Sequence, residues 1–133
     1  MAAQSRKSNQ ELVQELVTEP ADKLVFNSPF LVSQKIQVRM TNKGQTRIGW
    51  TLKTSNSSRF TISPAFGTLA KKEQTIIDVS CQSFDYKVNK PDKADRMIIE
   101  WLDAPDGEAE FRREWFAMSG VLRRKVIPLE YNL

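Results

Sequence analysis

Four carboxylates are the residues whose types and spacing come closest to a catalytic arrangement: Asp103, Asp106, Glu108 and Glu110. A pair of carboxylates can serve as general acid and general base. These four, however, lie in or beside the segment Ala104-Pro105-Asp106-Gly107, which is typical of a tight turn. Solvated carboxylates are ordinary in turns. The chain also has no histidine, so it lacks the commonest general base and zinc ligand. We therefore expect no enzymatic activity.

Cofactor and metal sites are not indicated either. The acidic residues do not follow the calcium-loop pattern, and the five glycines form no phosphate-binding loop. The one cysteine, Cys81, follows Ile77 and Val79 at alternate positions, so we expect a core thiol rather than a nucleophile. A single cysteine excludes an intrachain disulfide and favours a reducing compartment.

Basic residues suggest binding rather than catalysis. The net charge is +4, with clusters at Lys71-Lys72, Arg112-Arg113 and Arg123-Arg124-Lys125. On a strand, Arg112 and Arg113 point to opposite faces, and basic side chains also protect exposed strand edges from unwanted pairing. We expect no nucleic-acid partner.

The N-terminus is polar and no apolar run is long enough to span a membrane, so we expect a soluble, cytoplasmic protein.

Strands must position these residues, because apolar residues recur at every second position. The alternation is clearest at 36–40, 48–52 and 97–101. Phe60 and Ile62 form a strand that ends at Ser63-Pro64, and 110–116 is the expected hairpin partner of 97–101. With a last strand at 122–129, the pattern predicts an all-β sandwich of about seven strands. Trp50, Trp101 and Trp115 are expected mainly in its core.

The 133 residues fit one domain, whose hydrophobic content of 40% can fill a single core. We expect a polar, flexible extension at 1–18 and the folded domain at 19–133. Leu12, Val13, Leu16 and Val17 could form one helical turn capped by Asn9, although a frayed tail is favoured over that turn.

Several segments resemble, in order, those of the nematode major sperm proteins. The N-terminal half contributes Lys23-Leu-Val-Phe-Asn-Ser-Pro-Phe30, Arg47-Ile-Gly49, Lys53-Thr-Ser-Asn56 and Val79-Ser-Cys81. The C-terminal third contributes Glu100-Trp101, Pro105-Asp-Gly107, Phe111-Arg-Arg-Glu-Trp-Phe116, Arg123-Arg-Lys125 and Glu130-Tyr-Asn132. The resemblance covers about 20–132 and implies a seven-stranded, PapD-like, immunoglobulin-like sandwich.

The same resemblance implies a cytoskeletal protein that forms symmetric dimers and then nucleotide-free filaments for the crawling of amoeboid sperm. It would place the protein in the cytoplasm of the sperm pseudopod, with itself or related cytoskeletal proteins as partners. Assembly would use the segment Lys23, Leu24, Val25, Phe26 and Asn27, and the basic run Arg123, Arg124 and Lys125.

A second branch of the superfamily, the vesicle-associated membrane protein-associated proteins, binds acidic FFAT peptides through a similar domain. Phe84-Asp85-Tyr86 resembles that branch. Its peptide site corresponds in chemical type to Lys53, Thr54 and Arg96, with Ile98 where methionine is usual. The branch's Lys-Thr-Thr-Ala-Pro motif is Lys53-Thr-Ser-Asn-Ser57 here. An adaptor that binds an acidic peptide or a filament component is therefore the alternative function.

Overall fold

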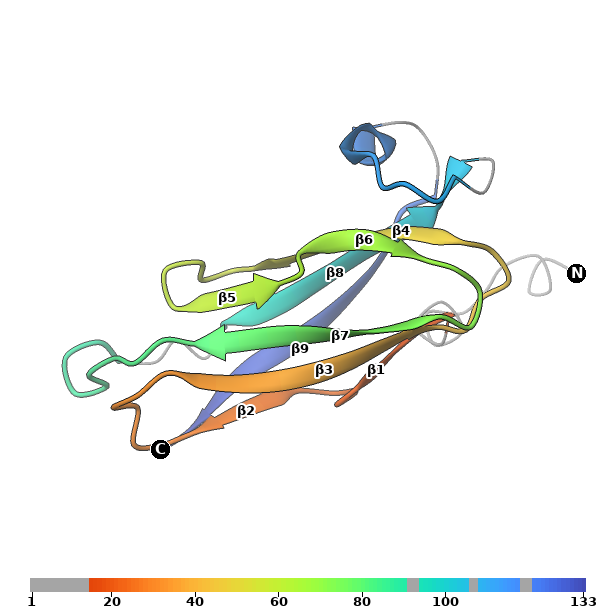
Figure 1. Cartoon of the computed structure of the whole chain (residues 1–133). Helices are drawn as coiled ribbons and strands as arrows, with labels where there is room; N and C mark the ends of the chain where they lie inside the picture. The colour runs from red at the N-terminus through yellow and green to blue at the C-terminus, as the bar shows by residue number, and fades with distance from the viewer. Residues whose placement is uncertain (1–14, 91–93, 106–107, 118–120) are drawn as a thin grey trace, which may run out of the picture.

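Two β-sheets pack face to face in the computed structural model, which describes residues 15–90, 94–105, 108–117 and 121–133 (Figure 1). The four-stranded sheet has the order β1-β3-β7-β5 and the five-stranded sheet the order β2-β9-β8-β4-β6. In chain order the strands are β1 (Leu16–Glu19), β2 (Leu24–Asn27), β3 (Gln34–Asn42), β4 (Ile48–Thr54), β5 (Phe60–Ser63), β6 (Phe66–Leu69), β7 (Gln74–Cys81), β8 (Arg96–Asp103) and β9 (Arg123–Asn132).

The core lies between the sheets and follows the alternation of the sequence. Successive side chains of a strand point to opposite faces, so every second residue is buried. On β7, Ile77, Val79 and Cys81 point inward, and burial raises the pKa of the Cys81 thiol. The three tryptophans are at most 4% exposed. The prediction of core positions is thus confirmed for Cys81, Trp50 and Trp101, whereas Trp115 is buried outside this core.

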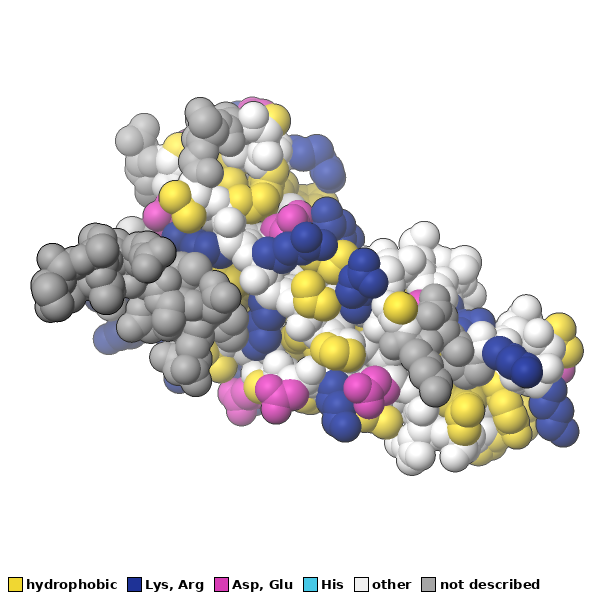
Figure 2. Space-filling view, turned by 180° about the vertical axis from the view of Figure 1, so that it is seen from behind, with side chains coloured by type: hydrophobic (Ala, Val, Ile, Leu, Met, Phe, Trp, Pro, Cys, Tyr) yellow, Lys and Arg dark blue, Asp and Glu magenta, His cyan; other side chains and the backbone are white. Residues whose placement is uncertain are grey.

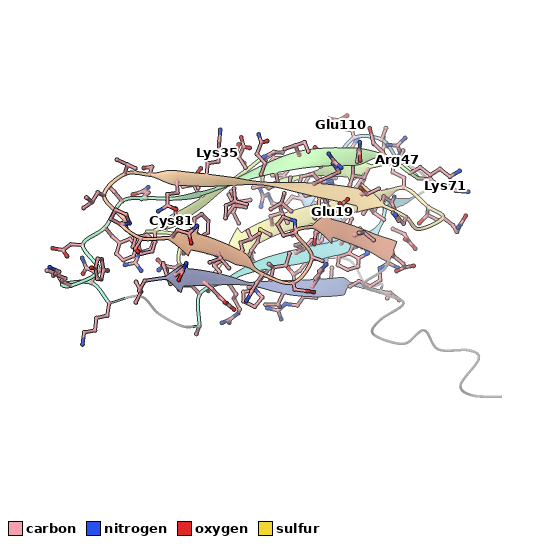
Figure 3. The ribbon with its side chains drawn as sticks, turned by 90° about the horizontal axis from the view of Figure 1, so that it is seen from below. Glu19, Lys35, Arg47, Lys71, Cys81 and Glu110 are labelled. Atoms are coloured by element: carbon pink, nitrogen blue, oxygen red, sulfur yellow. The ribbon has the colours of Figure 1, made fainter. Side chains whose placement is uncertain are left out.

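The all-β sandwich is confirmed, but the described residues form nine strands rather than seven. One reason is that the chain changes sheets near Pro20. β1 pairs antiparallel with β3, and β2 pairs in parallel with β9 of the other sheet. Seen from below in Figure 3, both short strands lie along one border of the sandwich, between β3 and β9.

The expected strand at 110–116 is wrong. Residues Arg113–Ala117 form a short 3-10 helix, η3, and β8 pairs instead with β9 on one side and β4 on the other. With both edges of β8 occupied, the segment after the Pro105 turn has no strand to pair with. The rings of Phe111, which precedes η3, and Trp115, which lies within it, have their centroids 5.8 Å apart.

Residues Leu16, Val17 and Thr18, which the sequence assigns to the extension, belong to β1. Leu16 and Thr18 are completely buried, and all three residues pair with β3. The helical turn considered for 12–17 is thus replaced by strand at Leu16 and Val17, while Leu12 and Val13 lie outside the described residues. Within the described ranges, no helix is long and apolar enough to span a membrane.

Candidate protein-interaction surfaces

The expected dimer segment forms the border strand of the five-stranded sheet. Leu24 and Phe26 of β2 point into the core and are 1% exposed, whereas Val25 is half-buried and Asn27 exposed. β2 has a strand partner on one side only, through its parallel pairing with Leu129–Asn132 of β9. The Asn132 amide also donates to Asn27 Oδ1 at 2.9 Å. Its other side faces away from the sheet, as β2 ends the strand order.

The basic run at the start of β9 is divided by strand alternation. Arg123 turns toward β1 and β8, 3.7 Å from Glu15 and 2.8 Å from Asp103. Lys125 donates to Thr18 Oγ1 at 2.9 Å, and burial lowers the pKa of its ammonium group, partly offset by Asp22. Lys125 therefore joins β9 to β1, and Arg123 joins β9 to β8 and to Glu15, the residue before β1. Arg124 alone points to the outer face, opposite Glu100.

Three of the four candidate peptide-binding residues share the outer face of the five-stranded sheet. Lys53 of β4 pairs with Ile98 of β8, and Arg96 lies two residues before Ile98 on the same face. Lys53 Nζ is 3.1 Å from the Glu100 carboxylate. Thr54 points the other way, and its hydroxyl accepts a hydrogen bond from the Asn56 amide at 3.1 Å. The structure thus brings Lys53, Arg96 and Ile98 together on this face but not Thr54.

The neighbours of Ile98 make this outer face both apolar and basic. Ile98 is only 7% exposed although it points outward, while Val126, its partner on β9, is 45% exposed. Arg124 lies two residues before Val126 on the same face. Figure 2, which views the molecule from behind, shows Lys and Arg side chains among apolar patches on this face, with Asp and Glu side chains beside several of them. Such a face suits a ligand with acidic and apolar groups.

Three of the four carboxylates singled out in the sequence, Asp103, Glu108 and Glu110, lie among the described residues. Asp103 accepts hydrogen bonds from Thr46 Oγ1 and Arg123, both at 2.8 Å. Glu108 and Glu110 are exposed, and Asp106 lies outside the described residues. Across the part of the chain that the structure describes, no three histidine, cysteine or acidic side chains gather as a metal site would require.

One apolar end of the sandwich was not recognised from the sequence. The loops after β2 and β7 expose Leu31, Val32 and Val88 by 69–78%. Between these loops lies an open groove of about 620 Å³, lined by Phe30, Phe84 and Tyr86 among others. The rings of Phe30 and Phe84 stack at 4.8 Å. The alternation rule does not extend to loops, so only the unusual density of apolar residues at 30–32 could have signalled this end.

Comparison with solved structures first defines the class of fold. The MSP-domain protein SSP-19 of Caenorhabditis elegans aligns with a TM-score of 0.65 at 16% identity, covering 86% of this chain and 98% of its own. WR4, an MSP family member of C. elegans, gives 0.67 at 18%, covering 88% and 97%. A PapD-like domain of human CEP192 gives 0.57 at 11%, covering 96% and 88%. The fold is therefore the PapD-like, immunoglobulin-like sandwich.

Sequence comparison then defines the family. The model of the MSP (major sperm protein) domain matches residues 15–119. Major sperm protein 2 of Onchocerca volvulus and major sperm protein isoform alpha of Ascaris suum are each 44% identical over 117 residues, covering 87% of this chain and 91% of theirs. Major sperm protein 78 of C. elegans is 40% identical over 119 residues, covering 89% and 93%. This chain belongs to the major sperm protein domain family.

Proposed function

We propose that this chain is a non-catalytic cytoskeletal protein that self-associates through β2 and extends its dimers into filaments through a second surface. In the sperm cytoplasm such filaments would support amoeboid movement. Its partners would be further copies or related family members, without nucleic acid, nucleotide or metal. The identity to proteins named major sperm protein supports this reading.

The open side of β2 is the observation that carries the proposal. A border strand has peptide groups that no neighbouring strand bonds, and a two-fold axis through such an edge joins two identical strands. A second, separate surface is needed for growth, because contacts that do not close on themselves extend as a fibre. Arg124 lies on a different side of the molecule from the β2 edge and is available for that second contact.

Sedimentation velocity over a roughly 100-fold concentration range, with and without a crowding agent, tests the proposal. We expect a monomer–dimer equilibrium at low concentration and large species with crowding. A strict monomer under every condition would remove self-association as the function. Because the readout is the mass of the particle, no partner needs to be known in advance.

A peptide adaptor is the second candidate, and the outer face formed by Lys53, Arg96 and Ile98 favours it. Its basic and apolar groups suit an acidic peptide that carries aromatic side chains. Titration with a fluorescent FFAT-type peptide should then give saturable binding. Binding should weaken about tenfold or more in Lys53→Glu or Arg96→Glu, and Lys35→Glu on the opposite sheet is the matched control.

A further inference from the structure

The side chain of Gln34 occupies the outward edge of β2. Its Oε1 accepts a hydrogen bond from the Asn27 backbone amide at 3.2 Å, and its Nε2 donates to the Asn27 backbone carbonyl at 2.8 Å. One primary amide therefore bonds both peptide groups of a strand residue, as a neighbouring strand would. Gln34 begins β3 of the other sheet, so this contact bridges the open border of the sandwich.

The alternation of a strand shows which peptide groups are affected. The Ser28 amide donates to the carbonyl of Asn132 on β9 at 2.9 Å, so even-numbered residues turn their peptide groups toward β9. Odd-numbered residues turn theirs away, and Asn27 does so toward Gln34. By the same alternation, the peptide groups of Val25 point outward from the sheet.

We propose that a second copy of this chain pairs its β2 antiparallel with this edge. Gln34 limits this pairing, because its side chain occupies the backbone groups of Asn27 until it moves away, and we call it the gate. The proposal rests on the self-association proposed above and specifies its strand register and its control. The two-fold axis passes beside Val25, so that Val25 of each copy exchanges both backbone hydrogen bonds with Val25 of the other.

The proposed register places the two-fold axis at Val25 because it is the middle one of the outward-facing positions Lys23, Val25 and Asn27. In an antiparallel pair centred on Val25, Lys23 of one copy lies opposite Asn27 of the other at both ends of the contact. Both positions turn their peptide groups outward, so each should exchange a pair of backbone hydrogen bonds. Gln34 already holds those groups of Asn27, which leaves only the central Val25 pair while the gate is closed.

Opening the gate requires little rearrangement. Both Gln34 hydrogen bonds are solvent-exposed, and a typical hydrogen bond contributes a net ~0.5–1.5 kcal/mol. The side chain can leave by rotation about its own bonds, without a change in either sheet. Gln34 therefore protects the edge from indiscriminate pairing but yields to a strand of matching register.

Removal of the gate is the first test. Gln34→Ala should lower the dimer dissociation constant about tenfold, since two gates are lost per dimer. Gln37→Ala is the matched control, because Gln37 lies on the same strand but donates to Asp78 at 3.2 Å on the outer face of the four-stranded sheet. It should dimerise as the unmodified chain does.

Two variants of Val25 test the register. Val25→Pro removes an outward amide that β9 does not use, so the fold should persist while dimerisation weakens at least tenfold. Val25→Glu places two carboxylates opposite each other at the axis and should have the same effect near neutral pH. Circular dichroism verifies folding, and the glutamate variant keeps the test decisive if the proline variant unfolds.

The outcomes separate this inference from the function on which it rests. Dimers that respond to neither Gln34 nor Val25 changes would overturn the inference while leaving self-association intact. A monomer for the unmodified chain but a dimer for Gln34→Ala would support the gate. If neither the unmodified chain nor Gln34→Ala associated, both the gate and self-association would be overturned. If Gln37→Ala lowered the dimer dissociation constant as much as Gln34→Ala, Gln34 would be rejected as the specific gate.

Discussion

Gly49 on β4 shows how one missing side chain shapes the surface. A Cβ atom added at this position would lie 2.8 Å from two atoms of the Trp115 ring. Trp115, on η3, therefore packs directly on the strand backbone and is 4% exposed. Phe111 contacts the same ring, and the Phe66 ring lies 4.9 Å from the Phe111 ring, tilted by 31°. Gly49 thus allows η3 to cover one end of the five-stranded sheet.

We predict that Gly49→Ala lowers the free energy of unfolding by about 1–3 kcal/mol, as overpacking does elsewhere. The added methyl group should displace Trp115 and change its fluorescence. Urea titration followed by tryptophan emission measures both effects. Thr51→Ala, two residues along the same strand face, is the control and should cost about 0.5 kcal/mol or less. Equal effects of the two changes would contradict the close packing at Gly49.

Tyr131 belongs to a polar group enclosed by aromatic rings. Its hydroxyl donates to Asp95 and accepts from Arg59 Nη1 at 3.1 Å. Asp95 is 3% exposed, and Arg59 lies 3.8 Å from the centre of the Phe84 ring. Burial, followed by the hydrogen bond to Asp95, raises the pKa of Tyr131 above its ordinary value of 10.0.

This pKa shift predicts a loss of stability at alkaline pH. A tyrosine whose pKa is raised on folding stabilises the fold fully below the unfolded pKa, and that contribution falls as pH rises past about 10. The free energy of unfolding should decline by at most ~1.4 kcal/mol per pH unit from this group. Tyr131→Phe should lack this decline. If the free energy of unfolding fell with pH equally steeply in the unmodified chain and in Tyr131→Phe between pH 9 and 11, Tyr131 would not be the group responsible.

At the scale of the element, β9 combines two roles in one strand. Its inward cations Arg123 and Lys125 contact β1 and β8, whereas Arg124 and Val126 lie on the outer face. The three consecutive cations of the sequence are therefore not one surface. Only Arg124 has the orientation that an assembly contact on the outer face requires.

We predict that the three cations respond differently to alanine substitution. Arg123→Ala and Lys125→Ala should each lower the free energy of unfolding by about 1–2 kcal/mol, because partly buried partners lose their bonds. Arg124→Ala should change stability by no more than about 0.5 kcal/mol but reduce the large species formed with crowding. Thermal unfolding and light scattering measure the two effects. If Arg124→Ala lowered the free energy of unfolding as much as the other two substitutions, the outward placement of Arg124 would be contradicted.

Alternation allowed much of the fold to be predicted from the sequence. β3, β4, β7 and β8 bury one face each, and an apolar residue at every second position is sufficient to recognise such strands. The segment 110–116 misled the prediction, because its aromatic residues pack on Gly49 from outside the sheet rather than within it. Alternation does not reveal which neighbour already occupies a strand's edge.

The candidate surfaces were predictable only in part. The resemblance grouped Lys53, Thr54, Arg96 and Ile98, and the pairing of β4 with β8 places three of them on one face, with Lys53 opposite Ile98. The separation of Arg124 from its neighbours follows from strand alternation. The contact between Gln34 and Asn27 depends on how a loop returns to the border of the sandwich, and neither spacing nor residue type indicates it.

At the scale of the whole molecule, the two proposed contacts differ in their chemistry. The β2 edge would pair through backbone groups, and its nearby cation, Lys23, lies 3.6 Å from Glu130 of the same chain. The outer face presents Arg124, Arg96 and Lys53. Salt screens exposed charges but affects backbone hydrogen bonds much less.

We therefore predict that ionic strength separates the two stages of assembly. Raising sodium chloride from about 50 to 500 mM shortens the screening length severalfold. It should leave the dimer dissociation constant within about threefold, while the large species formed with crowding decrease strongly. Sedimentation velocity and light scattering on the same samples measure both stages. Equal salt sensitivity of dimers and large species would contradict a charge-dependent second contact.

The pairing of β2 with β9 also sets when the assembly edge can exist. Asn27 and Asn132, which bond across this pair, are 105 residues apart in the chain. During synthesis, β2 leaves the ribosome long before β9 has been translated and has no sheet to join. The edge therefore forms only on molecules whose C-terminal strand is complete, and neighbouring nascent chains on one messenger RNA cannot yet associate through it.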